Sequence, residues 1–177
     1  MRAPARATFH AVLSPHQVLL HSAAVVAAAA IAQHGALAEY FSQDDFAGLA
    51  RAVGLLPRLA GPWRWLSHQL FWDVMRSVAG LEPLAYHVAS LMAHAAGAVL
   101  LLLWLRARVS APAALAGAAL FAAHPALFTS VHWISAIGDP LALAFGLAAL
   151  LLLERRDGGR WLALPAFGAA LLSKESA

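Results

Sequence analysis

The chain has 177 residues, of which 62% are hydrophobic and 12% charged, with a formal net charge of +3 and no cysteine. Soluble domains of this size are about half apolar and about a quarter charged, so the composition excludes an ordinary soluble domain, and the absence of cysteine excludes disulfides. The arginines flank apolar blocks and form no basic face with interleaved aromatic residues, which excludes nucleic acid as the expected partner. We therefore expect an all-α, polytopic transmembrane helix bundle in a lipid bilayer.

The first predicted span covers residues 17–38, after a basic N-terminal stretch. A signal peptide begins in a similar way, but its apolar core has only about 7–15 residues, so this segment is interpreted as a retained span. The first outer loop, 39–83, contains two stretches with helical apolar spacing, 41–56 and 63–78. Tryptophan is common at membrane interfaces, so we expect both stretches to be amphipathic helices lying on the membrane surface.

The remaining predicted spans are 84–105, 112–128, 139–153 and 161–173, which gives about five spans in all. With this count, the arginine clusters in the short connections all fall on one side, the cytoplasmic side by the positive-inside rule. The N-terminus would then be cytoplasmic, and the outer loop, the 124–139 segment and the end of the chain would lie outside. Eleven arginines beside one lysine and no asparagine indicate a GC-rich bacterial genome, hence the bacterial cytoplasmic (inner) membrane. The chain stops directly after a span, so we expect one membrane domain, 1–177, as the N-terminal part of a longer protein.

Paired acids follow the first span, at Asp44 and Asp45. Adjacent carboxylates at a membrane face supply a general base, because one charge raises the pKa of the other, or they bind a divalent cation through oxygen. A structural role is equally open, since Ser42-x-x-Asp45 resembles a capping box at the start of a helix. The sequence leaves the cofactor unknown, with a divalent cation as one option.

Two further outer segments carry polar groups. In the segment from His124 to Asp139, we expect Pro125 to bend or end the third span, so that polar residues there line a cavity. The candidates are His124, His132 and Asp139; alternatively, His132 and Trp133 serve as interface anchors. The eight-residue spacing of the histidines matches no recognised metal-ligand pattern, so no metal site is predicted. At the end of the chain, Lys174 either contacts a lipid phosphate or extends to the interface. In the second span, His87, Ser90, His94 and Gly97 share one face, which indicates helix packing more than substrate contact.

Taken in order, these segments resemble the N-terminal part of a polytopic membrane glycosyltransferase with the GT-C fold, of the protein O-mannosyltransferase-like or tetratricopeptide-associated type. The resemblance rests on Asp44-Asp45, Trp63-Arg-Trp-Leu-Ser67, Tyr86-His87 with His94, Phe121-Ala-Ala-His-Pro125, Ser130-Val-His-Trp-Ile134, Gly138-Asp139 and Leu172-Ser-Lys-Glu175. Trp65 stands where the family usually has proline, and the arginine that the family often has just before the Asp139-type acid is missing, with Ala136-Ile137 in its place.

The resemblance implies transfer of a sugar from a polyprenyl-phosphate donor to an acceptor hydroxyl on the outer face, with Asp44 or Asp45 as the base. The departing phosphate is negative, so Arg64 and Lys174 are expected to stabilise it, and Arg64, His124, His132, Asp139, Lys174 and Glu175 are the candidate substrate-binding residues. The sugar and the acceptor are not specified by the sequence. A transporter or flippase subunit and a non-catalytic membrane scaffold are the alternatives.

Overall fold

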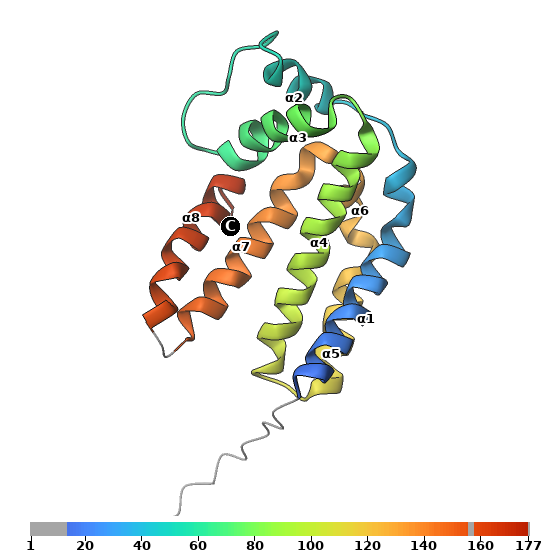
Figure 1. The fold of residues 1–177 in the computed structure, drawn as a ribbon, viewed down its shortest axis with the longest axis vertical. Coiled ribbons are helices and arrows are strands. Elements are labelled where there is room, and N and C mark those ends of the chain that lie inside the picture. The colour runs from blue at the N-terminus through green and yellow to red at the C-terminus, as the bar shows by residue number, and fades with distance from the viewer. Residues whose placement is uncertain (1–13, 156–157, 177) are drawn as a thin grey trace, which may run out of the picture.

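The computed structural model describes residues 14–155 and 158–176, and every regular element in this part of the chain is helical. Five helices form the bundle, two short ones lie over one end of it, and a third short one lies beside its central helix (Figure 1). The bundle helices are α1 (Pro15–Gln33), α4 (Pro83–Arg106), α5 (Ala111–Ala123), α7 (Gly138–Leu153) and α8 (Ala163–Ser173). The short helices are α2 (Asp45–Ala52), α3 (Phe71–Ala79) and α6 (Phe128–His132). Single turns join them: η1 (His34–Ala38), η2 (Leu66–Leu70, a π-helical turn), η3 (Pro125–Leu127), η4 (Ile134–Ile137) and η5 (Gly158–Leu162). The all-helical fold class is confirmed.

Three helical segments of the described chain are long and apolar enough to cross a membrane: Pro15–Ala38, Pro83–Arg106 and Ile134–Leu153. A fourth span results if α5 and the following helical pair Pro125–His132, bent by 47° at their junction, are counted as one. This bend occurs at His124-Pro125, as predicted, because proline cannot continue the α5 hydrogen-bond ladder. The chain thus has the features of a multi-pass membrane protein.

The helix at the expected fifth span is shorter than a membrane span requires. Helix α8 has 11 residues, and at about 1.5 Å per residue it covers roughly half of the ~30 Å hydrocarbon core. The count of about five spans is therefore not confirmed. The two expected loop helices exist as α2 and as η2 with α3, but they pack on the end of the bundle, and their position on a membrane surface stays a prediction.

The two ends of the bundle differ in structure, and the short connections at one end carry arginines. Figure 1 shows the α4–α5 and α7–α8 connections at the end where α1 begins, whereas α2 and α3 lie at the opposite end. Arg106 and Arg108 lie at the first connection and Arg155 and Arg160 at the second, as the span pattern predicted. The other arginines used in that argument, Arg2, Arg6 and Arg156, lie outside the described residues.

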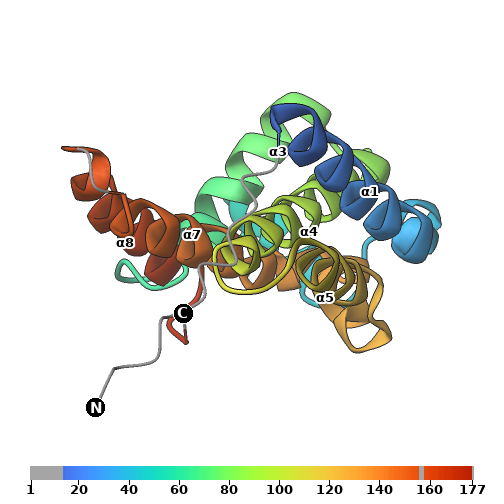
Figure 2. The same ribbon diagram turned by 90° about the horizontal axis from the view of Figure 1, so that it is seen from below.

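Helix α4 is the centre of the bundle. It packs against α1 and α5 on one side and against α7 on the other, and α8 adds to the outer side of α7 (Figure 2). Alanines from α1, α4 and α5 form the main core, where small side chains let the helix axes approach closely. The expected polar stripe of α4 is buried among the helices, as a packing role requires, and His94 Nε2 lies 2.9 Å from the carbonyl oxygen of Ala122.

A second apolar cluster holds α2 and α3 on the bundle. Trp72 of α3 is 2% exposed and lies against Gly48 of α2, where an added Cβ would be 2.3 Å from the indole ring. The hydroxyl of Tyr86, at the start of α4, donates a hydrogen bond to the carbonyl oxygen of Gly80 at 2.8 Å. These contacts fix the outer loop relative to the bundle, and with it the residues of the candidate site.

Candidate functional site

A cavity of about 160 Å³ lies where the outer loop meets η4, the start of α7 and the end of α8. Its chemistry comes from residues far apart in the sequence: Asp44, Arg64, His68, Ser135, Asp139 and Lys174. Four of these, Asp44, Arg64, Asp139 and Lys174, were predicted as site residues, and the fold brings all four to one cavity. The carboxylates and the cations balance one another, so a charged ligand has to compete with internal ion pairs.

The two paired acids have different surroundings. Asp45 is 1% exposed, and its carboxylate accepts hydrogen bonds from the backbone N–H of Ser42 at 2.9 Å and from the N–H and hydroxyl of Ser135 at 2.8 and 2.6 Å. Asp44 is exposed and lines the cavity, and its carboxylate forms no hydrogen bond or ion pair with the described residues. Asp45 therefore has a structural role close to the capping-box interpretation, and Asp44 is the acid available to a ligand.

Arg64 joins the outer loop to the end of the chain. Its guanidinium forms a two-point ion pair with Glu175, in which Nε donates to Oε2 at 2.6 Å and the second N–H donates to Oε1. This hydrogen bonding raises the pKa of Arg64, and it lowers the pKa of Glu175 to about 2. Arg64 has φ +55°, a left-handed conformation that non-glycine residues adopt at a cost and that clusters at functional sites.

Lys174 forms the second ion pair of the cavity. It follows the last residue of α8, and its Nζ donates to Oδ1 of Asp139 in the first turn of α7. Both side chains are about a third exposed, so the pair is accessible to a ligand. An acid in the first helical turn is also stabilised by the N-terminal end of the helix dipole, which holds Asp139 in place.

The geometry of the cavity depends on the close approach of η2, α7 and α8. The buried Ser67 of η2 donates its hydroxyl hydrogen to the carbonyl oxygen of Ser173 at 2.7 Å. Gly138 lies between them, and a Cβ at that position would be 2.7 Å from the same carbonyl oxygen and 3.2 Å from the Ser67 hydroxyl. Only glycine therefore allows α7, α8 and the outer loop to meet this closely.

The structure does not bring His124 and His132 to the cavity. Nδ1 of the exposed His124 accepts from the N–H of Ala126 at 3.1 Å and so caps the short turn that follows. His132 is mostly buried, lies 2.7 Å from Glu39 through Nδ1, and stacks on Phe128. Both histidines are thus engaged in local structure, and of the trio expected to line one cavity only Asp139 does so.

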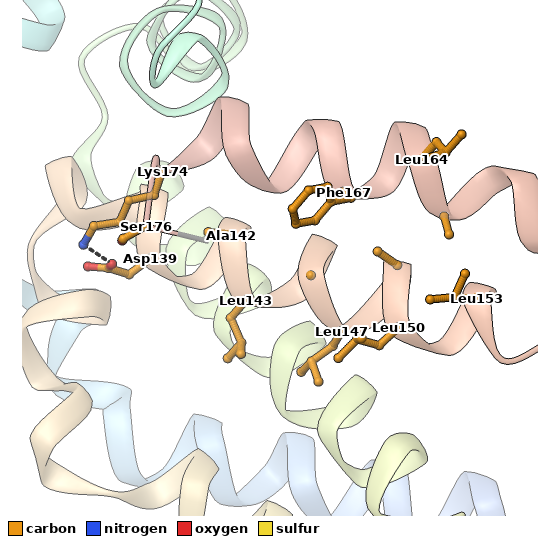
Figure 3. Close-up of a pocket in the computed structure, with 13 residues that line it drawn as sticks. Asp139, Ala142, Leu143, Leu147, Leu150, Leu153, Leu164, Phe167, Lys174 and Ser176 are labelled. Carbon is orange, nitrogen blue, oxygen red and sulfur yellow. Dashed lines mark hydrogen bonds and ion pairs between the residues drawn. The ribbon is translucent and has the colours of Figure 1, made fainter.

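An apolar groove of about 660 Å³ runs between α7 and α8, and it begins at the cavity (Figure 3). Leu143, Leu147 and Leu150 line it from α7, and Leu164 and Phe167 from α8. The close-up shows the ion pair between Asp139 and Lys174 at one end of the groove. These two residues line both the groove and the cavity, so a charged recess opens directly into an apolar channel along the helices.

From the sequence, no role was assigned to Ser67, and His68 and Ser135 were not singled out. His68 directly follows Ser67, the last residue of the Trp63–Ser67 motif, and this position beside the motif is its one sequence signal. Ser135 had no sequence signal, because its role depends on its contact with Asp45. Among the described residues, no three His, Cys, Asp or Glu side chains are grouped so that they could hold a metal ion.

Comparisons of the chain with protein-family models, with curated proteins and with solved structures give no match.

Proposed function

We propose that the chain is part of a membrane glycosyltransferase that transfers a sugar from a polyprenyl-phosphate donor to an acceptor hydroxyl on the outer face of the membrane. One observation carries the proposal: Asp139 and Lys174 belong both to the charged cavity and to the apolar groove. A lipid-linked sugar has this same polarity, with an apolar chain joined through phosphate to a polar head. The groove suits the prenyl chain and the cavity suits the phosphate.

Arg64 and Lys174 are the phosphate-binding residues in this proposal. Each now pairs with a carboxylate, Glu175 or Asp139, and a phosphate would take the place of at least one of them. Arginine and lysine form charge-assisted hydrogen bonds with phosphate oxygens, and these strengthen as charge develops on the leaving group. Glu175 in this scheme competes with the lipid for Arg64.

Asp44 is the base. It accepts the proton of the acceptor hydroxyl while that oxygen forms a bond to the anomeric carbon of the sugar. The bond from the same carbon to the phosphate oxygen breaks, and the phosphate leaves with the electron pair. The carboxylate of Asp44 is exposed at the cavity and forms no hydrogen bond or ion pair with the described residues, which supports this role, whereas the carboxylate of Asp45 is occupied by its hydrogen bonds.

Native mass spectrometry of the purified chain with added undecaprenyl phosphate tests the proposal. The wild-type chain should retain this lipid more strongly than undecaprenol, which lacks the phosphate. Loss of one charge-assisted contact is worth about 1.5–3 kcal/mol, so Arg64→Ala and Lys174→Ala should each weaken retention about tenfold or more. Glu175→Gln should strengthen it, because the competing carboxylate is gone.

Arg58→Ala is the matched control. Arg58 lies in the same loop and also pairs with an acid, Asp73, at 2.9 Å, but it does not line the cavity. Its variant should retain the lipid phosphate like the wild type. Equal retention of undecaprenol and undecaprenyl phosphate by the wild type would overturn the proposal.

Two other classes of function give different results. A transporter or flippase subunit predicts movement of the lipid or a solute across proteoliposome membranes without sugar transfer. A non-catalytic scaffold predicts no lipid-phosphate preference, and no effect of Asp44→Asn on any transfer activity. The bacterial cytoplasmic membrane and the outward orientation of the cavity belong to the proposal, supported by the arginines in the short connections at the opposite end of the bundle.

A further inference from the structure

The buried hydroxyl of Ser67 fixes the protonation pattern of its neighbour His68. Ser67 Oγ lies 2.7 Å from the carbonyl oxygen of Ser173, 3.4 Å from that of Arg64 and 3.0 Å from Nδ1 of His68. A carbonyl oxygen only accepts, so the single hydroxyl hydrogen is directed to a carbonyl and not to the imidazole. For the third contact to be a hydrogen bond, Nδ1 of His68 has to carry a hydrogen and donate it to Ser67.

This arrangement leaves the other ring nitrogen free. In a neutral imidazole with hydrogen on Nδ1, Nε2 carries a lone pair and is an acceptor. Nε2 of His68 has no hydrogen-bond partner among the described residues. It is also not one of the atoms of these residues that are both fully buried and without a partner. His68 lines the cavity together with Asp44 and Asp139.

The surroundings of His68 keep the ring neutral. Burial lowers its pKa most, and the positive charges of Arg64 and Arg51 lower it further, against smaller opposite effects of Glu175 and Asp44. The ordinary histidine pKa is about 6.5, so a ring with a lowered pKa is unprotonated at neutral pH. The lone pair on Nε2 is then available under physiological conditions.

We propose that His68 is an acceptor-binding residue of the site, in which Nε2 accepts a hydrogen bond from a hydroxyl group of the acceptor. This inference rests on the proposed function and adds to it a residue outside the sequence motifs. Asp44 and His68 would be two hydrogen-bond acceptors at one cavity, suited to a ligand that offers neighbouring hydroxyls, as sugars do. The proposed phosphate-binding residues, Arg64 and Lys174, are hydrogen-bond donors. The phosphate and the acceptor hydroxyls would therefore be bound by opposite kinds of side chain.

The first test is the tautomer of His68, measured by long-range ¹H–¹⁵N correlation on the ¹⁵N-histidine-labelled chain in detergent at pH 7. The signals of His68 are identified by their loss in His68→Gln. We expect hydrogen on Nδ1 and a lone-pair shift for Nε2, the opposite of the tautomer that free histidine favours. Ser67→Ala removes the partner of Nδ1 and should shift the ring toward hydrogen on Nε2. A His68 ring that is charged, or that carries its hydrogen on Nε2 in the wild type, would refute the proposal.

The second test uses glycerol as a small probe with neighbouring hydroxyls. Its addition should move the Nε2 resonance of His68 toward the hydrogen-bonded range and leave that of the exposed His124, outside the cavity, almost unchanged. Equal responses of the two histidines would show no hydroxyl binding at His68 and overturn the inference. Neither NMR measurement uses the lipid. The role of His68 can therefore be tested even if the chain does not prefer undecaprenyl phosphate, and a negative NMR result does not change the outcome of the lipid-phosphate test.

Discussion

The carboxylate of Asp45 is bound to Ser135, 90 residues further along the chain, through both the backbone N–H and the hydroxyl. This contact joins the outer loop to η4, the turn that precedes α7. Its neighbour Asp44 remains exposed at the cavity. The two acids of one motif are therefore separable by experiment.

Asp45→Ala should lower the free energy of unfolding by about 3 kcal/mol, because hydrogen bonds to a charged group are lost and their donors are left unpaired. Asp44→Ala should change it by less than about 0.5 kcal/mol, as expected for an exposed side chain away from such features. Thermal unfolding in one detergent compares the two variants. A loss of stability in Asp44→Ala as large as that in Asp45→Ala would contradict the division of roles.

The sequence predicted the long helices well. The expected span 84–105 corresponds to α4, Pro83–Arg106, within one residue at each end, because proline suits the first helical turn and a continuous apolar run follows. It predicted α8 less well, since composition alone does not separate an 11-residue apolar helix from a spanning one. The break after α5 was expected from Pro125.

The site was only partly predictable, for a physical reason. Asp44, Arg64, Asp139 and Lys174 could be proposed because charges beside apolar spans are costly and therefore stand out. Ser67 carries no such signal, since its importance comes from a contact with the carbonyl oxygen of Ser173, 106 residues away. Backbone approaches of this kind exist only in the folded chain.

Gly138→Ala should destabilise the junction of α7, α8 and the outer loop. The new methyl group would lie 2.7 Å from the Ser173 carbonyl oxygen, so backbone has to move, at a cost of about 1–3 kcal/mol. Gly146→Ala, on the same helix with nothing within 4 Å of its added Cβ, is the control and should be neutral or stabilising by up to about 1 kcal/mol. Thermal unfolding in detergent measures both, and equal melting temperatures would show that the junction is looser than described.

The titration of Glu175 should depend on Arg64. The ion pair lowers the Glu175 pKa from 4.5 to about 2, so its contribution to stability is fully present above the unfolded-state pKa and is lost as the pH falls from about 4.5 toward 2. Carboxyl ¹³C NMR of the labelled chain should show a midpoint near 2 in the wild type. Arg64→Ala should raise the midpoint toward the ordinary glutamate value, whereas Arg58→Ala should leave it unchanged. A wild-type midpoint already near 4.5 would mean that the pair is not formed in solution.

Filling the groove between α7 and α8 should displace a bound prenyl chain. Gly146 lines the groove with open space at its Cα, so Gly146→Leu places a side chain inside it. Each buried CH₂ is worth about 0.8 kcal/mol, and loss of two or more from the bound lipid weakens retention about tenfold or more. Gly168→Leu on α8 is the matched control, because Gly168 is equally unobstructed but does not line the groove. Native mass spectrometry with undecaprenyl phosphate should show lipid loss in the first variant alone, and unchanged retention in Gly146→Leu would place the prenyl chain elsewhere on the bundle.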